Sequence, residues 1–545
     1  MRHIELVTEI NDASKLLSLA MDRYVQACAA IPDHFQTGSN TAQALLDCAL
    51  AELPKVSAHE EKFHRAKAAL RRTRNQCPNL VPINALPFEV MSHIFWLSWD
   101  CLLSASKRPN LIFPSALLRV CSRWRQITLG SHKLWSHIDV HTNWAPNLSL
   151  KRVELFAVQS NRLPLDLHIK NGLLSFNYHE ALDRFYRSVA PRIQSLDLHH
   201  GDDLNPLYGD EQPWLDALLS GAKAGTLTQL CIKSYGLQAV PAFLLAKDST
   251  LPGRSYIRIS ATEQHLEELF SSVTKLQLKS IYPFWTSQAY RGLVELSLDA
   301  FRGANIAIKD SELAVIFEES PGLQVLHFGL EVEPTQKDGF LPPVQLNYLQ
   351  LLQLTSYSHS VQESVLRMIH PGQCPLQLII KVSDEVRFFL PSTTWAECTS
   401  FAARSNIVLL HVEQRERGFV DVLGILSIMP HLEVLELDGF TLGQQCEELL
   451  GGYDALSYLS MLTDYDHPPL PQQLRLLRLL RCTIHWNDFR HTPEIHPTEK
   501  LVLDHCQVDF HPSQGPDLES ALGRVTPIVQ LHENRVIRVV SGSGR

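Results

Sequence analysis

The sequence contains no apolar segment long enough to cross a membrane. No stretch reaches the roughly 18 apolar residues that a membrane helix needs. Residues 1–17 carry Glu5, Glu9 and Asp12 where a secretory signal would have a basic start and an uninterrupted apolar run. These absences argue against a membrane partner and predict a soluble protein of the cytoplasm, the nucleus or both.

Paired cysteines and an excess of basic charge are also missing. The eleven cysteines are an odd number and form no C-x-x-C pair, which favours a reducing compartment over a disulfide framework. With 58 acidic against 49 basic residues, the formal net charge of −9 opposes a sequence-independent grip on phosphate backbones. That charge argues against a nucleic-acid partner, whereas the content of 45% hydrophobic and 20% charged residues predicts a globular chain.

Motifs of common catalytic sites are absent as well. The sequence has no G-x-x-x-x-G-K-S/T phosphate loop, no G-x-S-x-G elbow, no H-E-x-x-H and no G-x-G-x-x-G. Catalysis would need a general base, a nucleophile or a cofactor cradle, and no segment offers such a set. The protein is therefore not expected to be an enzyme.

Two segments have residue types of a metal site without a specific pattern. Residues 199–211 directly follow a predicted strand and are more simply a polar loop, although they offer His199, His200, Asp202 and Asp203. A second set has loosely zinc-like spacing but lacks a paired knuckle, namely Cys482, His485, His491 and His496. We expect neither a metal nor a cofactor.

Helical patterns fill the first quarter of the chain. Residues 12–30, 41–53 and 57–76 have helix-forming composition, the last with a heptad-like stripe. Another helix is expected to begin at Pro87. A further one is expected from a Ser115 cap to Gly130, with an apolar stripe of Leu117, Cys121, Trp124 and Thr128. Because such a stripe is most often core, that interpretation stays open beside a partner-binding surface.

A short phrase, L-x-x-L-x-L with an often aromatic or cysteine ninth position, recurs about ten times after residue 190. Each copy predicts a strand with alternating burial, and helical segments lie between many of them. Copies begin at residues 193, 227, 273, 293, 323, 346, 407, 432, 474 and 498. Such repetition is typical of a leucine-rich-repeat solenoid, and its irregular spacing leaves an ordinary α/β domain as the competing interpretation.

The repeats also predict which side chains face outward. If the copies at 273 and 293 are neighbouring strands in register, Lys275 lies beside Glu295 and Lys279 beside Asp299. The exposed positions expected to contact a bound protein are Asp197, His199, Lys275, Glu295, Glu436 and Asp438. Because they mix both signs of charge, the substrate itself stays unknown.

Two segments together resemble an F-box, particularly the variant expanded in mushroom-forming fungi: residues 83–98 (INALPFEVMSHIFWLS) and 114–138 (PSALLRVCSRWRQITLGSHKLWSHI). That pattern is an L-P-x-E-V/L-x-x-I-F helix, a variable insert, a V-C-x-x-W-R-x-I/L helix and an L-W close. The matching residues are Leu86-Pro87, Glu89, Ile94-Phe95, Val120-Cys121, Trp124-Arg125 and Leu134-Trp135. Two departures are the long connector at 98–114 and Lys133, where proline often precedes L-W.

The resemblance implies docking onto a Skp adaptor and, through it, onto a cullin–RING ubiquitin ligase of the SCF type. The repeats would hold a protein substrate, so the chain would be a non-catalytic receptor. The adaptor-binding residues or their immediate support would be Leu86, Pro87, Ile94, Phe95, Leu97, Val120, Cys121, Trp124, Leu134 and Trp135. A leucine-rich-repeat scaffold acting without a ligase is the alternative, and a metal-dependent hydrolase is a third.

The predicted fold class is therefore α/β, with N-terminal helices and an all-α F-box followed by an irregular leucine-rich-repeat solenoid. Five regions are expected: an N-terminal helical region at 1–80, the F-box at 82–140, a linker and start of the repeats at 141–190, the repeat domain at 191–510, and a cap with a flexible tail at 511–545.

Overall fold

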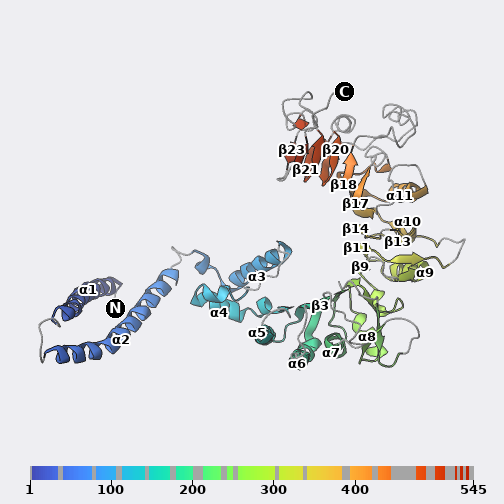
Figure 1. The fold of residues 1–545 in the computed structure, drawn as a ribbon. Helices are drawn as coiled ribbons and strands as arrows, with labels where there is room; N and C mark the ends of the chain where they lie inside the picture. Colours follow the sequence, from blue (N-terminus) through green and yellow to red (C-terminus); the bar gives the residue numbers. More distant parts are fainter. Residues whose placement is uncertain are drawn as a thin grey trace. The chain divides into compact units, whose positions relative to one another are not determined.

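The computed structural model divides the chain into two units, Met1–Ser131 and His132–Arg545. The residues that it describes are 3–34, 41–76, 82–105, 113–141, 146–171, 179–200, 213–234, 242–249, 256–300, 306–335, 341–356, 358–382, 393–419, 428–442, 474–485, 498–509, 522–523, 528–531 and 536–538. The first unit is helical and the second is built on a large parallel sheet, so the chain is mixed α/β (Figure 1).

The first unit consists of α-helices and short 3-10 turns. Its elements are α1 (His3–His34), α2 (Thr41–Gln76), η2 (Pro82–Ala85), α3 (Phe88–Ala105), η3 (Leu117–Arg119) and α4 (Ser122–Gly130). The expected separation between helices at 41–53 and 57–76 is wrong, because α2 continues through Pro54. One proline removes one backbone hydrogen bond, and the strong helix formers on both sides sustain the helix. Among the described helices, none has both the length and the apolarity to span a bilayer.

Helix α4 begins later than its apolar stripe predicts. Cys121, not Ser115, is its N-cap: the Cys121 backbone is extended (φ −158°, ψ 172°), and its Sγ accepts a hydrogen bond from the Trp124 N–H at 3.5 Å. Leu117–Arg119 forms a separate 3-10 turn. A turn followed by a helix preserves the three- and four-residue spacing of apolar side chains, which is why the sequence resembled one continuous helix. The helix ends at Gly130, as expected.

The second unit is a succession of parallel strands. The described part of its main sheet has 17 strands. They are β1 (His137–His141), β2 (Leu165–Asn171), β3 (Ile193–His200), β4 (Gln229–Ser234), β7 (Lys275–Lys279), β9 (Glu295–Asp299), β11 (Val325–Phe328), β14 (Leu351–Leu354), β16 (Leu376–Val382), β17 (Ile407–Phe419), β18 (Val434–Leu442), β19 (Leu474–Leu480), β20 (Thr483–His485), β21 (Thr498–Asp504), β22 (Gln507–Asp509), β23 (Ile528–Leu531) and β24 (Val536–Arg538). From β1 to β19 each strand pairs with the next in this order, and β19 then pairs with β21 and β21 with β23. The short strands β20, β22 and β24 form a side branch, in which β20 pairs with the end of β18.

Shorter elements complete this unit. The helices and 3-10 turns are η4 (His132–Trp135), α5 (Pro146–Gln159), α6 (His179–Val189), η6 (Ala190–Arg192), α7 (Pro213–Gly221), α8 (Glu263–Phe270), η8 (Gln288–Tyr290), α9 (Asp310–Glu318), α10 (His359–Met368) and α11 (Thr393–Ala403). Small parallel sheets join β5 (Ala242–Ala246) with β6 (Tyr256–Ile259) and β8 (Ile281–Tyr282), β10 (Ala307–Lys309) with β12 (Glu331–Glu333), and β13 (Val344–Leu346) with β15 (Ile369–Pro371). Within the unit, α6 to α11 lie on one side of the main sheet (Figure 1).

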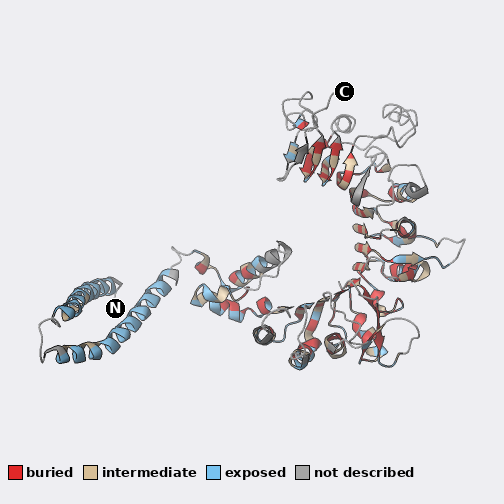
Figure 2. Cartoon of the chain, in the orientation of Figure 1, coloured by how far each residue is buried: buried red, intermediate tan, exposed pale blue. Residues whose placement is uncertain are grey.

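Two rows of buried side chains run across the main sheet. The first row joins thirteen strands from Ile138 through Leu296 to Leu501, and the second lies two residues further along each strand, from Val140 through Leu298 to Leu503. In the middle of the sheet the paired residues of the first row are Leu230, Leu276, Leu296, Leu326, Leu352 and Leu378. Burying one such side chain contributes about 1.5–3 kcal/mol. Buried residues therefore concentrate along the strands, whereas α1 and α2 are mostly exposed (Figure 2).

The sheet includes strands that the recurring phrase did not predict. β1, β2 and β16 were missed. β2 and β16 follow Pro164 and Pro375, where most other copies have an apolar residue, and β1 has Trp135, Ile138 and Val140 at the three positions where the phrase has leucine. The copy expected to begin at 346 is out of frame by three residues, since Leu352 and Leu354 pair in the rows. Leucines at 346, 349, 351, 352 and 354 allow either frame, and only the strand pairing decides between them.

Several copies end in a left-handed residue at the eighth position of the phrase. Ser280, Gly439, Arg481 and His505 have φ values of 67°, 84°, 51° and 55°. The ninth residue of each copy then turns inward, and the four ninth residues are buried: Ile281, Phe440, Cys482 and Cys506. At Gly439 a Cβ would lie 2.3 Å from the Gln414 carbonyl oxygen, so glycine meets both the backbone angle and the close approach.

Two expected boundaries differ from the structure. The units divide after Ser131, whereas the F-box was expected to extend to 140. η4 and β1 belong to the second unit, where the Trp135 ring packs against the Phe156 ring of α5 at a centroid distance of 5.0 Å. At the other end, β23 and β24 continue the sheet into the region expected to be a cap and tail.

We predict that Leu296→Ala lowers the free energy of unfolding by about 2–5 kcal/mol, because it removes a fully buried side chain from the middle of the first row. Denaturant unfolding followed by circular dichroism measures this loss. Tyr348→Ala is the control, since Tyr348 is exposed and should change the free energy by less than about 0.5 kcal/mol. Equal effects of the two substitutions would contradict the proposed importance of the row.

Candidate functional site

Helices α3 and α4 pack through a small apolar contact. Met91 and Phe95, one turn apart on α3, are buried, and the Phe95 ring lies 4.8 Å from the Trp124 ring of α4. The Oγ atoms of Ser92 and Ser131 are 2.7 Å apart at the other end of the contact. These interactions join two short helices that have little core of their own.

Asn84 ties the segment before α3 to α4. Its side-chain oxygen accepts a hydrogen bond from Trp124 Nε1 at 3.3 Å, and its backbone carbonyl accepts one from the Arg123 guanidinium. The same guanidinium also donates to the Leu86 carbonyl. Asn84 is itself buried. The turn that precedes Pro87 is therefore held by hydrogen bonds rather than by apolar packing, and it fixes where α3 begins.

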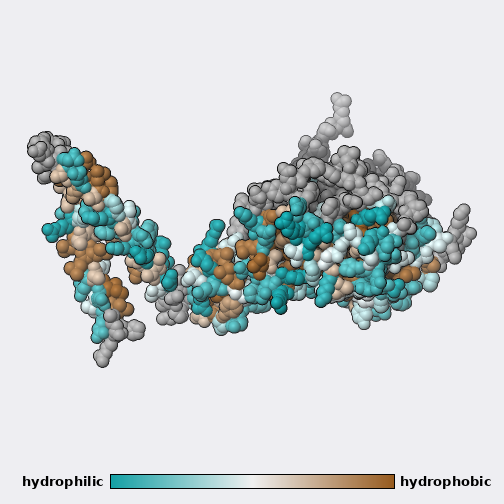
Figure 3. Space-filling view, turned by 90° about the horizontal axis from the view of Figure 1, so that it is seen from below, coloured by the Kyte–Doolittle hydropathy of each residue, from teal (hydrophilic) through white to brown (hydrophobic). Residues whose placement is uncertain are grey.

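An apolar stripe remains on the outer side of α3. Pro87, Val90, Ile94 and Leu97 recur at three- and four-residue spacing and so share one face of the helix. Val90 and Leu97 are 43% and 47% exposed, and Ile94 is half-buried. We call these four residues the outer stripe. Seen from below, hydrophobic surface lies over the region of α3 and α4 as well as along α1 and α2 (Figure 3).

The ten residues expected at the adaptor surface divide into three groups. Pro87, Leu97 and Val120 are exposed. Leu86, Ile94, Cys121 and Trp124 are half-buried. Three are buried instead of presenting a surface: Phe95 faces α4, and Leu134 and Trp135 lie in the second unit. Motif positions that match equally well in sequence thus have different structural roles.

Three exposed apolar residues of this region were not predicted as partner-binding. Phe88, Val90 and Leu129 are each about two-fifths exposed. Phe88 also lies near Gly130, where an added Cβ would be 3.3 Å from the Phe88 ring. The helical spacing from Pro87 could have identified Val90. Phe88 and Leu129 lie outside that spacing, so the sequence offered no comparable pattern for them.

The outward face of the sheet carries the charge pairs predicted from the repeats. Lys275 pairs with Glu295 and Lys279 with Asp299 in the strand register. The Lys275 Nζ–Glu295 Oε1 distance is 2.6 Å, and the Lys279 Nζ–Asp299 Oδ2 distance is 2.9 Å. This prediction is confirmed, and it follows from copies spaced 20 residues apart lying side by side.

A second group of charges lies further along the same face. Glu436 accepts a hydrogen bond from His411 Nδ1 at 3.0 Å and lies 3.5 Å from Arg478 Nη1. Asp438 was expected to be exposed, but it is only 8% exposed because Arg481 Nε donates to it at 2.6 Å. Asp438 is therefore a paired, buried carboxylate rather than a free contact residue.

Histidines and carboxylates gather at the start of the sheet. Asp197 on β3 accepts a hydrogen bond from His168 Nδ1 on β2 at 3.0 Å, and its Oδ1 lies 2.9 Å from His199 Nε2. Burial would raise the pKa of Asp197, but the two neighbouring imidazoles hold it well below its usual range. His137 and Asp139 on β1 lie beside His168. Sequence reasoning placed Asp197 and His199 on this face and missed the other three.

Most residues of the two segments considered as metal sites in the sequence have no described side chain, His485 among them. His200 has no described side chain, and Asp202 and Asp203 lie outside the described residues. Cys482 is buried at its repeat position, as expected, and its Sγ is 3.4 Å from the Leu437 carbonyl oxygen. His491 and His496 also lie outside the described residues.

We predict that Glu436 stabilises the fold at neutral pH and ceases to do so in acid. The hydrogen bond from His411 lowers the pKa of Glu436, against burial that would raise it. A carboxyl group whose pKa is lowered by folding stabilises the folded state at pH values above its unfolded-state pKa. This stabilisation is lost as the pH falls through its folded-state pKa. Unfolding free energies should therefore differ more between the wild type and Glu436→Gln at about pH 6 than at about pH 3.5.

Glu433→Gln serves as the control for this comparison, because Glu433 is exposed and its ion pair with Arg475 is long, at 3.8 Å. Its effect should be small at both pH values. A difference for Glu436→Gln that stays constant between the two pH values would contradict the prediction.

Comparison with known proteins yields no match for this chain, neither to a family model nor to a curated protein. The case for function therefore depends on two features of the chain itself. One is the outer stripe of α3 with its support from α4, and the other is the charged outward face of the parallel sheet.

Proposed function

We propose that this protein is the substrate-recognition subunit of an SCF-type cullin–RING ubiquitin ligase. Its helices α3 and α4 would form the F-box that docks onto a Skp adaptor, and its second unit would be an irregular leucine-rich-repeat solenoid that binds a protein substrate. The observation that carries the proposal is the outer stripe of α3, within a segment that resembles the F-box pattern of mushroom-forming fungi.

The outer stripe has the properties of a docking surface. Val90, Ile94 and Leu97 follow one face of α3, while Met91 and Phe95 are buried, Phe95 against Trp124 of α4. The helix therefore has one apolar stripe for its own unit and another that is left at the surface. Covering Val90 and Leu97 by a partner would bury apolar area at about 25 cal/mol per Å². A few such central apolar residues commonly dominate the affinity of an interface.

The second unit supports the repeat interpretation through its regularity. Thirteen parallel strands each contribute two side chains to the same two buried rows, and helices cover one side. The opposite face carries rows of charged and polar groups, including the Lys275–Glu295 and Lys279–Asp299 pairs. A long polar face on a repetitive frame is typical of solenoids that bind other proteins.

In this proposal the chain itself performs no bond-breaking step. It would hold the substrate near the ligase so that ubiquitin transfer is favoured by proximity. The localisation would be cytoplasmic, nuclear or both, where the ligase components occur. A repeat scaffold that binds its partner without a ligase is the alternative, and the adaptor-binding test separates the two.

We predict that the double variant Val90→Glu/Leu97→Glu loses adaptor binding by at least about tenfold, because it places two charges in the centre of an apolar contact. The full-length chain is used to capture purified Skp adaptor and cullin, and binding to the adaptor is quantified by biolayer interferometry. Both residues are exposed, so the fold should persist by circular dichroism.

Val158→Glu on α5 is the matched control, since Val158 is an exposed helical valine of the second unit. It should leave adaptor binding unchanged. Undiminished binding by the double variant would overturn the outer stripe as the docking surface. Absence of adaptor and cullin binding by the unaltered chain would overturn the ligase function and leave the scaffold alternative.

A further inference from the structure

Strand register brings metal-binding residue types together at the start of the sheet. β1, β2 and β3 pair so that Asp139 faces His168 and His168 faces Asp197. His137 lies two residues before Asp139 and therefore on the same face of β1. The result is a group of imidazoles and carboxylates contributed by strands that are about 30 residues apart in sequence.

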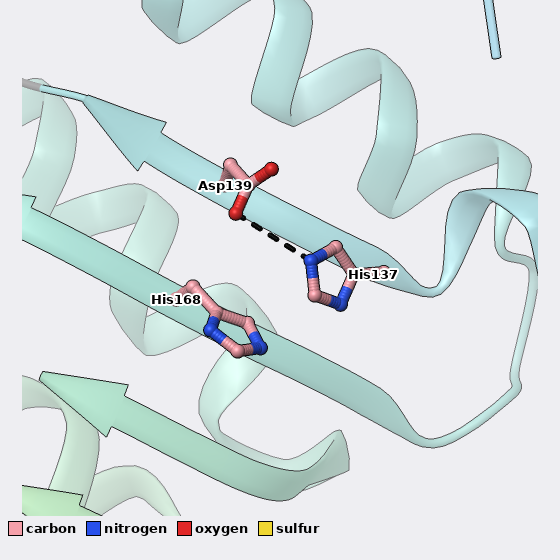
Figure 4. A group of neighbouring side chains, drawn as sticks. All are labelled: His137, Asp139 and His168. Atoms are coloured by element: carbon pink, nitrogen blue, oxygen red, sulfur yellow. Dashed lines mark ion pairs between the residues drawn. The ribbon is translucent and has the colours of Figure 1, made fainter. Parts of the chain in front are cut away.

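His137, Asp139 and His168 lie close enough to share one ion. Each offers a ligand atom within 4.8 Å of the other two, and the imidazole rings of His137 and His168 are 4.3 Å apart between centroids. His137 Nε2 is 3.5 Å from Asp139 Oδ1. Figure 4 shows the two rings facing each other across the strands, with the Asp139 carboxylate beside His137.

These distances suit a tetrahedral ion after a small adjustment. Two ligand atoms that are each about 2.0–2.1 Å from Zn²⁺ lie roughly 3.3 Å apart at a tetrahedral angle. The separation between His137 Nε2 and Asp139 Oδ1 is already near this value. A shift of the order of 1 Å, within the range of side-chain rotation, would bring the His168 ring to the same ion.

Asp197 holds His168 in the orientation that a ligand needs. His168 Nδ1 is 3.0 Å from Asp197 Oδ2, so donation from Nδ1–H leaves the lone pair of Nε2 available. Histidine ligands commonly donate their second nitrogen to a carboxylate in this way, which fixes the ring and raises its basicity. Asp197 is itself held by His199 at 2.9 Å.

The group is largely buried, and its carboxylate already has positive charge nearby. The side chains of His137 and Asp139 are only 11% and 10% exposed, and a buried carboxylate is costly unless it is paired or coordinated. Arg152 on α5 also contributes positive charge near Asp139, while its guanidinium packs over the Phe156 ring at 5.1 Å. A bound ion would therefore interact with the Asp139 carboxylate in addition to Arg152, without displacing the guanidinium.

We propose that His137, Asp139 and His168 bind one divalent transition-metal ion, with Zn²⁺ the best match, and that Asp197 is the positioning residue for His168. Two imidazole nitrogens and one carboxylate suit Zn²⁺ better than Mg²⁺ or Ca²⁺, which prefer oxygen ligands. Three protein ligands leave a fourth position for water or for a side chain of a bound protein. This site does not depend on the proposed ligase function.

A neighbouring set, Asp197, His199 and Cys231, is the rival location. Burial and the nearby Asp197 raise the pKa of the Cys231 thiol, whereas the proposed set needs no thiolate. In this second set Asp197 would bind the ion directly, whereas in the proposed site it accepts the hydrogen bond that orients His168. Spectroscopy of a cobalt-substituted protein separates the two sets, because only the rival includes a thiolate.

The test uses the full-length chain purified without a polyhistidine tag, stripped with a chelator and titrated with Zn²⁺ against a fluorescent competitor. His137→Gln and His168→Gln should each remove one equivalent of tight binding, and Asp197→Asn should weaken that equivalent by about 10–100-fold. His411→Gln is the matched control, because His411 forms a comparable pair with Glu436 on the same face. It should leave the stoichiometry unchanged.

Co²⁺ titration should give visible d–d absorption without a thiolate charge-transfer band, and this spectrum should be lost in His137→Gln. Thermal unfolding of the stripped variants shows whether they remain folded. The proposal is overturned if the unaltered chain binds no equivalent of Zn²⁺ with a dissociation constant below about 10 μM, which corresponds to about −7 kcal/mol. It is also overturned if folded His137→Gln binds as well as the wild type, or if a thiolate band shows that the ion lies at Cys231.

Discussion

The two rows of buried side chains are the constraint on which the second unit depends. Each of the thirteen strands in these rows presents apolar side chains at two positions, two residues apart, that align with those of its neighbours. Everything between those positions and the next strand is free to vary in length. This explains how copies separated by 20 residues, as at 273 and 293, and by 46, as at 227 and 273, occupy neighbouring strands in one sheet.

The sequence predicts the part of the fold that depends on alternation and fails where the pattern has two solutions. Lys275 and Glu295 were correctly paired because each stands at the third position of a copy whose frame is unambiguous. Around Leu352 the leucines fit two frames, and β16 follows a proline in place of the usual apolar residue. Cys121 is the N-cap of α4, although its place in the apolar stripe fits a helix interior equally well. Apolar spacing does not predict a cap, because capping depends on the backbone conformation of the residue.

The candidate sites show the same division between local and long-range information. The residues of the outer stripe are close in sequence, so helical spacing brings Val90 and Leu97 to one face. Only the exposed fraction seen in the structure distinguishes these two residues from Phe95, which also belongs to the motif but packs against Trp124. The group around His168 draws on different strands, and no local pattern connects these residues. Their proximity follows only from strand pairing, which the sequence does not specify in advance.

Arg481 illustrates a wider consequence of the left-handed residues that end several strands. Its backbone conformation costs about 1–2 kcal/mol relative to the usual region, yet its side chain reaches Asp438 and Glu413 on two preceding strands. The guanidinium therefore comes from the turn after the strand, outside the buried rows. Charges supplied from such turns can change from one chain to another without loss of the apolar rows. A frame of this kind can therefore carry different charges on its outward face while the fold stays constant.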